Sequence, residues 1–112
     1  MANRFKVAPV EERTFEGIVF ASKREMMRYA NLRLMERAGA ISQLSVQPEF
    51  KVEINGLHFC TYTADFKYFD ALLDKWVIEE VKSSGTAKDA AYRLRKKAAE
   101  LFFGIKITVI LK

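Results

Sequence analysis

The chain has 112 residues, which is enough for one domain with a single two-layer core but not for two domains. Half of the residues are hydrophobic and 12% are aromatic, and this composition excludes a disordered chain. The net charge of +5 favours an acidic partner, nucleic acid first, and the single cysteine excludes an intramolecular disulfide and a cysteine-cluster zinc site.

No apolar run is long enough to span a membrane, and the N-terminus lacks the apolar core of a signal peptide. The lone thiol, Cys60, fits a reducing cytoplasm, where we expect it to be a small buried core residue. The single histidine, His58, argues against nuclease chemistry built on paired histidines. We therefore expect a cytoplasmic protein with no membrane partner.

Residues 1–14 are polar and irregular, and we expect a flexible arm there, followed by a single domain over residues 15–112. The β-branched stretch at residues 14–20 predicts a strand. Ser22 and Glu25 form the capping-box pattern of a helix start, and Gly39 is a suitable C-terminal stop. The expected buried stripe of this helix is Met26, Met27, Ala30, Leu34, Met35 and Ala38, and its expected exposed face carries Lys23, Arg24, Arg28, Arg33 and Arg37.

Two alternating runs, residues 44–54 and 57–69, flank Asn55-Gly56, which is a strong signal for a type I′ hairpin. A third strand is expected over residues 76–82, then a helix over residues 87–103 and a last strand over residues 105–111. The expected buried stripe of the second helix is Ala91, Leu94, Ala98, Leu101 and Phe102, and Gly104 would end it.

The resulting order is strand, helix, three strands, helix, strand. It predicts an α/β fold in which a mixed β-sheet is flanked by two helices. The last helix returns the chain to a neighbouring strand, and such a crossover is expected to be parallel and right-handed.

Three polar residues stand out: Asp65 in Tyr62-Thr-Ala-Asp-Phe66, and Glu80 with Lys82 in Val77-Ile-Glu-Glu-Val-Lys82. Strand alternation puts Glu80 and Lys82 on one face with Trp76, so both are half buried and need partners or a metal ion. Carboxylates are hard oxygen ligands for Mg²⁺, and a lysine can orient an attacking water or offset negative charge. The alternative is a cross-strand salt bridge on a solvated sheet face.

Four motifs occur in order along residues 16–105: Gly17-Ile-Val-Phe-Ala-Ser-Lys-Arg-Glu25, Gln47-Pro48, Tyr62-Thr-Ala-Asp-Phe66 and Glu79-Glu-Val-Lys82. Together they resemble the PD-(D/E)xK, or restriction-endonuclease-like, nuclease superfamily, and within it a family of small phage and prophage proteins. In one departure, Glu80 stands where that family's pattern has aspartate. The carboxylate is kept, but its reach changes by one methylene.

The resemblance implies a restriction-endonuclease-like core and a Mg²⁺ or Mn²⁺ site held by Asp65, Glu80 and Glu25. Lys82 would serve the attacking water, and Gln47 would line the same cleft. Two of these roles have simpler alternatives. Glu25 is accounted for as a helix-capping residue, and a polar residue before a proline, such as Gln47, needs no function.

The expected function is therefore metal-dependent hydrolysis of DNA phosphodiester bonds. By analogy with the superfamily's small Holliday junction resolvases, we expect a homodimeric, structure-selective endonuclease in phage recombination or replication, located in a bacterial host. A phage or host recombination protein is a candidate partner. The residues expected to contact DNA phosphates are Lys23, Arg24, Lys88, Arg93, Lys96 and Lys97.

Each of these cations also fits an ordinary solvated helix face. Two further functions remain open. One is a nuclease-fold module that binds nucleic acid without cutting it, and the other is a nonenzymatic phage protein that binds a host partner.

Overall fold

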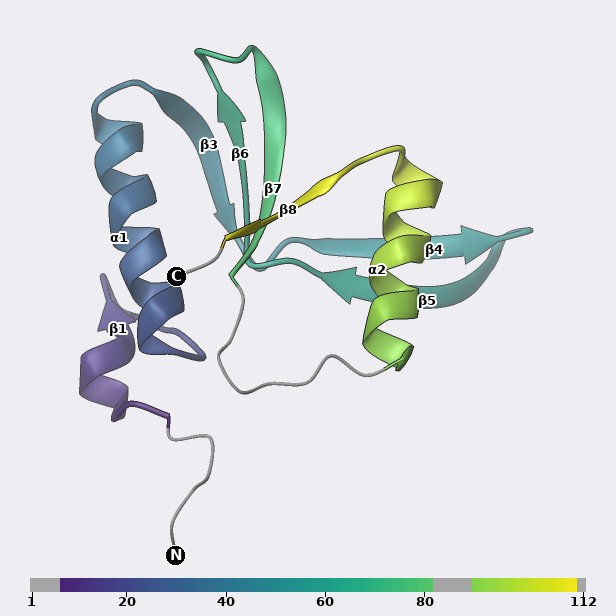
Figure 1. Cartoon of the computed structure of the whole chain (residues 1–112), viewed down its shortest axis with the longest axis horizontal. Helices are drawn as coiled ribbons and strands as arrows, with labels where there is room; N and C mark the ends of the chain where they lie inside the picture. The colour runs from purple at the N-terminus through teal and green to yellow at the C-terminus, as the bar shows by residue number, and fades with distance from the viewer. Residues whose placement is uncertain (1–6, 82–89, 111–112) are drawn as a thin grey trace, which may run out of the picture.

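The computed structural model describes residues 7–81 and 90–110 (Figure 1). In chain order, the elements are η1 (Val10–Arg13), β1 (Thr14–Phe15), β2 (Ile18–Val19), α1 (Lys23–Arg37), β3 (Ile41–Val46), β4 (Glu49–Ile54), β5 (Leu57–Thr63), β6 (Phe66–Asp70), β7 (Lys75–Val81), α2 (Ala90–Phe103) and β8 (Ile107–Ile110).

A four-stranded sheet with the order β3-β6-β7-β8 forms the centre of the fold. β6 is antiparallel to both β3 and β7, whereas β8 pairs with β7 in parallel. The predicted α/β class is therefore confirmed, with a mixed sheet, two helices and a parallel crossover through α2. α1 packs on this sheet through β3 and β7, on the left in Figure 1.

The N-terminal segment differs from its prediction. The strand expected over residues 14–20 is a small hairpin of β1 and β2, because Glu16 and Gly17 both adopt left-handed backbone conformations and turn the chain. Residues 10–13 of the expected arm form η1. The Arg13 side chain ties this segment to the domain by donating to the carbonyls of Ala8 (2.8 Å) and Phe20 (2.6 Å).

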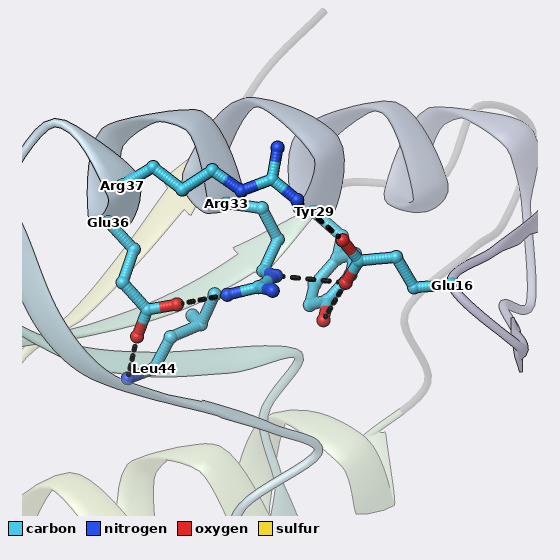
Figure 2. Close-up of polar contacts among 6 residues, drawn as sticks. All are labelled: Glu16, Tyr29, Arg33, Glu36, Arg37 and Leu44. Atoms are coloured by element: carbon cyan, nitrogen blue, oxygen red, sulfur yellow. Dashed lines mark hydrogen bonds and ion pairs between the residues drawn. The ribbon is translucent and has the colours of Figure 1, made fainter.

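A cluster of ionic contacts holds this hairpin on α1 (Figure 2). The Glu16 carboxylate accepts hydrogen bonds from Tyr29 Oη (3.1 Å), Arg33 Nε (2.9 Å) and an Arg37 guanidinium nitrogen (3.2 Å). Arg33 also donates to Glu36, which in turn accepts from the Leu44 amide in β3. Arg33 and Arg37, expected on a solvated face, thus connect β1–β2, α1 and β3.

Each of the two long strands expected around the Asn-Gly turn is broken into two. Gln47 has a left-handed φ of 54° and Pro48 has no amide to donate, so the chain leaves the sheet between β3 and β4. The returning chain breaks at the same level, between β5 and β6. The Gln47 amide donates to the Asp65 carbonyl (2.9 Å) and the Ala64 amide to the Pro48 carbonyl (3.1 Å), which keeps both chains adjacent through the break.

Beyond the break, β4 and β5 form the predicted hairpin, with Ile54 paired to Leu57 across the Asn-Gly turn. The hairpin points away from the four-stranded sheet, to the right in Figure 1, and α2 packs against it. Two hydrophobic clusters result. One, between α1 and the sheet, contains Phe20, Tyr29, Leu32 and Phe66, and the other, beneath α2, contains Phe50, Tyr62, Ile78 and Ala99.

The predicted buried faces of the helices are confirmed only in part: Met26 and Met35 of α1 and Ala98 of α2 pack against the core clusters. In α1, Tyr29 and Leu32 are buried, whereas Met27 and Leu34 are exposed. In α2 the small residue Ala99 contacts the core, and Leu94, Leu101 and Phe102 are exposed. Apolar residues occur on several sides of α1, so its sequence pattern selects no single face. In α2 the most apolar stripe is turned outward.

Candidate functional site

Asp65 lies at the junction of β5 and β6, where its side chain is bonded to the end of β7. Its Oδ2 accepts a hydrogen bond from the Val81 amide at 2.6 Å, and its own amide donates to the Glu79 carbonyl at 3.0 Å. The carboxylate thus takes the place of a backbone acceptor at the point where the β6–β7 ladder ends. This contact holds Asp65 beside Glu80, the next residue expected in the site.

Glu80 is buried on the side of β7 that faces α2. Its Oε1 accepts a hydrogen bond from Tyr62 Oη at 2.9 Å and lies 3.4 Å from Lys96 Nζ in α2. Burial raises the pKa of Tyr62, and the negative charges of Glu80 and Asp65 raise it further. Both carboxylates therefore lie near the Tyr62 hydroxyl, which stays protonated and donates to Glu80.

Glu25 reaches the same region from the first turn of α1. Its amide donates to Ser22 Oγ at 3.1 Å, so the predicted N-cap is present. Its carboxylate is buried, and Oε2 has no hydrogen-bond partner among the described residues. Burial, and then the charge of Asp65, raise the pKa of Glu25 from 4.5 to about 7. Capping alone does not explain a buried carboxylate on which the charge of Asp65 acts.

Of three further predicted site residues, Gln47, Lys82 and Lys88, the structure describes only Gln47. The side chain of Gln47 is exposed, and its contact with Asp65 is made by the backbone amide. Lys82 and Lys88 lie outside the described residues.

The remaining expected DNA contacts fall into two pockets on different elements. One pocket, of about 410 Å³, lies beside Glu80 under α2 and is lined by Glu80, Tyr92, Arg93, Lys96, Lys97, Glu100 and Val109. The other, of about 730 Å³, lies along α1 and is lined by Lys23, Arg24, Met27, Arg28, Asn31, Val81 and Ile110. Three of the expected cations thus share a pocket with a site carboxylate.

Glu79 is a buried charge that the sequence analysis did not single out. Its side chain is 1% exposed and accepts two hydrogen bonds from the Arg28 guanidinium, at 2.8 and 2.5 Å, and one from Tyr68 Oη at 2.5 Å. Arg28 was expected on the exposed face of α1, and this prediction is wrong. Strand alternation could have revealed Glu79, because it places this charge between Val77 and Val81 on the apolar face.

The described carboxylates can be tested for their fit to a divalent metal ion. In the described ranges, no three His, Cys, Asp or Glu side chains are grouped closely enough to form a protein-only metal site. Mg²⁺, however, is usually bound by one or two carboxylates together with water and substrate phosphates. Glu25 and Asp65 are such a pair, and the buried oxygen of Glu25 is a donor that a hard cation would use. The residues therefore fit Mg²⁺ or Mn²⁺.

Neither helix, in the parts that the structure describes, is long and apolar enough to cross a membrane. Comparison with curated proteins and with solved structures yields no significant match. A family model does match, and it covers residues 9–112. The chain therefore belongs to the family described as "protein of unknown function (DUF1064)".

Proposed function

We propose that this protein is a metal-dependent DNA endonuclease with a restriction-endonuclease-like core. The order of elements supports this fold: α1 is followed by the antiparallel strands β3, β6 and β7, and then by α2 and the parallel strand β8. The motif residues Glu25 and Glu80 lie on α1 and β7, and Asp65 lies between β5 and β6, which is compatible with this core. As a phage or prophage protein, it would act on DNA in a bacterial host.

The observation that carries the proposal is the proximity of Glu25 to Asp65. Forty residues separate the two in sequence, yet the charge of Asp65 acts on a Glu25 carboxylate that is buried and has an oxygen without a partner among the described residues. Two adjacent carboxylates repel each other unless a proton or a cation lies between them. A metal site explains why the chain keeps both.

The roles of the residues follow from their contacts. Glu25 and Asp65 would hold the ion, with Glu80 next to them. A divalent ion supplies Lewis acidity at the phosphate and an acidified water. Tyr62 and Lys96 fix the Glu80 carboxylate, and Lys82, which follows β7 in the sequence, would orient the attacking water. Arg93, Lys96 and Lys97 would bind backbone phosphates, which positions DNA without reading its sequence.

The test is cleavage of matched linear, forked and four-way-junction DNA in Mg²⁺ or Mn²⁺. Wild-type protein should cut in the presence of metal and not in EDTA. Asp65→Asn should lose at least about 100-fold in rate, the scale of removing one transition-state electrostatic contact. The asparagine keeps an oxygen that can accept from the Val81 amide, so the variant should remain folded.

Asp70→Asn is the matched control, because Asp70 lies at the other end of β6 and its carboxylate accepts from the Leu73 amide in a turn. This variant should cut like the wild type. Lys82→Ala should lose cleavage while keeping DNA binding. Equal cutting by wild-type and Asp65→Asn protein would remove the proposed site.

A homodimer is part of this proposal, because cutting two strands at one position needs two sites related by symmetry. The exposed apolar residues Leu94, Leu101 and Phe102 of α2 support self-association.

A non-cutting DNA-binding module is the second candidate. It is favoured by the contacts of Glu80 with Tyr62 and Lys96, because they compensate the carboxylate within the protein and leave it less need of a metal ion. Metal titration separates the two functions. The nuclease binds Mg²⁺ or Mn²⁺ in a manner that depends on Glu25, whereas the binding module has no such site and its DNA affinity depends only on salt.

A further inference from the structure

Two cross-strand pairs line one face of the two central strands. Phe69 of β6 is opposite Trp76 of β7, and Lys67 is opposite Ile78. Asp65 and Glu80 continue this series at the end of the ladder, where the Asp65 side chain bonds to the Val81 amide. An aromatic pair, a cation and an acid pair therefore follow one another along a single sheet face.

Trp76 is exposed although β7 is a central strand of the sheet, and Phe69 opposite it is half buried. Trp76 is 47% exposed, and its ring packs edge-on against Phe69 with a centroid separation of 5.5 Å. Lys67 Nζ lies 4.8 Å from the centroid of the Trp76 ring. Ile78, the next residue along this face, is buried beneath the α2 cluster. The cover provided by α2 thus ends before Trp76, which lies near the start of β7.

A lone aromatic pair would be explained as a cross-strand pair that stabilises a hairpin. Two features indicate that this pair has a binding role as well. A cation is placed at the ring, which gives the surface a positive charge next to a π-face. Trp76 also lies on the same strand as Glu80 of the proposed nuclease site, four residues or about 13 Å away, with the buried Ile78 between them.

We propose that this face is a stacking platform for an unpaired nucleobase of the DNA substrate, with Lys67 contacting the adjoining phosphate. This inference rests on the proposed function and narrows its substrate class. About 13 Å corresponds to about four stacked nucleotides of one strand, and to fewer if the strand is extended. A strand whose phosphate lies at Asp65 and Glu80 can therefore place a base on Trp76.

The platform selects for unpaired DNA because a base within a duplex is already stacked on both faces. Only a splayed nucleotide offers its ring to an aromatic side chain. The expected substrate is therefore a duplex with a single-stranded segment, such as a fork or a flap, in preference to a fully paired duplex or four-way junction.

Trp76 is the only tryptophan in the chain, so its emission reports this surface directly. The first measurement titrates wild-type protein in EDTA with a blunt duplex or with the same duplex carrying a single-stranded tail. Binding is followed in parallel by the anisotropy of labelled DNA. Tailed DNA should quench the tryptophan emission as it binds, and blunt duplex should bind without this quenching.

The second measurement uses three variants. Trp76→Leu keeps an apolar side chain but has no π-face, and it should weaken binding of tailed DNA by about 5- to 150-fold while changing blunt-duplex binding less than about twofold. Trp76→Phe should restore most of the affinity. Leu72→Ala, on the same hairpin and 89% exposed, should bind like the wild type.

Several results would overturn the platform. One is binding of tailed DNA with no change in Trp76 emission, and another is an equal loss of blunt and tailed binding in Trp76→Leu. Emission that shifts with protein concentration in the absence of DNA would assign the surface to self-association instead.

Cleavage in Mg²⁺ is scored separately, which keeps the two proposals distinguishable. If tailed DNA quenches the emission but is not cut, the stacking platform stands and the proposal of a nuclease is wrong. Cleavage of tailed DNA without quenching would retain the nuclease and remove the platform.

Discussion

Glu25 is the residue whose chemistry depends most on its neighbours. Its pKa of about 7 in the folded protein exceeds the ordinary value of 4.5, because the carboxylate is buried beside Asp65. Below pH 4.5 the group is protonated in both folded and unfolded chains, and it has no effect on stability. As the pH rises to 7, the unfolded chain ionises first, so the free energy of unfolding falls. Above pH 7 the free energy of unfolding is lowered by the whole effect of this pKa shift.

Glu25→Gln should therefore stabilise the metal-free protein at pH 8 by on the order of 1–3 kcal/mol and have little effect at pH 4. Urea denaturation in EDTA measures this difference. The same substitution should abolish any stabilisation by Mg²⁺ at pH 8. Glu53→Gln, on an exposed position of β4, is the control and should change neither quantity. A Glu25→Gln protein that is less stable than wild type at pH 8 would contradict the assigned burial.

The ion pair between Arg28 and Glu79 makes a different prediction, because the charge of Glu79 is buried and already compensated. Arg28→Met leaves that carboxylate with Tyr68 as its remaining hydrogen-bond donor in the described structure, and should cost about 3–5 kcal/mol in unfolding free energy. Lys23→Met, an exposed change on the same helix, should stay within about 0.5 kcal/mol. A loss of similar size in both variants would show that Arg28 acts through general helix charge and not through Glu79.

At the scale of elements, glycine conformations define where the helices end. Gly104 follows α2 with a φ of 66°, and the Ile105 amide donates back to the Glu100 carbonyl. An added Cβ would meet no atom within 4 Å, so the penalty of a side chain is one of backbone conformation alone. Gly104→Ala should cost about 1 kcal/mol, and Gly104→Asn should cost less, because asparagine tolerates the left-handed region better. Equal losses would indicate a packing role for this glycine.

Local signals were sufficient to predict many of these elements. Ser22 caps α1, Gly39 and Gly104 follow the two helices in left-handed conformations, and Asn55-Gly56 forms the hairpin turn. Each of these features depends on a few neighbouring residues. The break at Gln47-Pro48 also carried a local signal, the missing proline amide, which a continuous run of β-forming residues obscured.

Helix faces and partners of charged residues could not be predicted in the same way. Whether Leu101 or Ala99 faces the core depends on where β4 and β5 lie, and Lys96 meets Glu80 only because α2 crosses that hairpin. The proximity of Glu25 and Asp65 was expected from the family resemblance, whereas the burial that raises the pKa of Glu25 comes from packing between distant segments.

At the scale of the molecule, the fold is broad and thin, with principal extents of 44 × 43 × 23 Å. Its radius of gyration of 15.3 Å exceeds the about 13 Å expected for a compact chain of this length. The β4–β5 hairpin with α2 forms one part and the four-stranded sheet with α1 the other. Much apolar surface is left exposed as a result.

We expect the protein to sediment as a dimer at micromolar concentration, because Leu94, Leu101 and Phe102 form an exposed apolar surface on α2. Leu101→Glu should shift it to a monomer, since a charge within an apolar contact is costly. Leu72→Glu, on the exposed β6–β7 turn, should leave the dimer intact. A wild-type monomer at all concentrations would remove the homodimer from the proposal without affecting the carboxylate site.

Because the Val81 amide donates to the Asp65 carboxylate, the nuclear magnetic resonance signal of this amide depends on the position of the carboxylate. This amide hydrogen is held by a side chain and not by a neighbouring strand, so any rotation of the carboxylate changes its chemical shift and its rate of exchange with solvent. A cation that draws Asp65 away would release the amide to water. A backbone signal in β7 thus reports the state of the proposed centre without a substrate or a measured reaction.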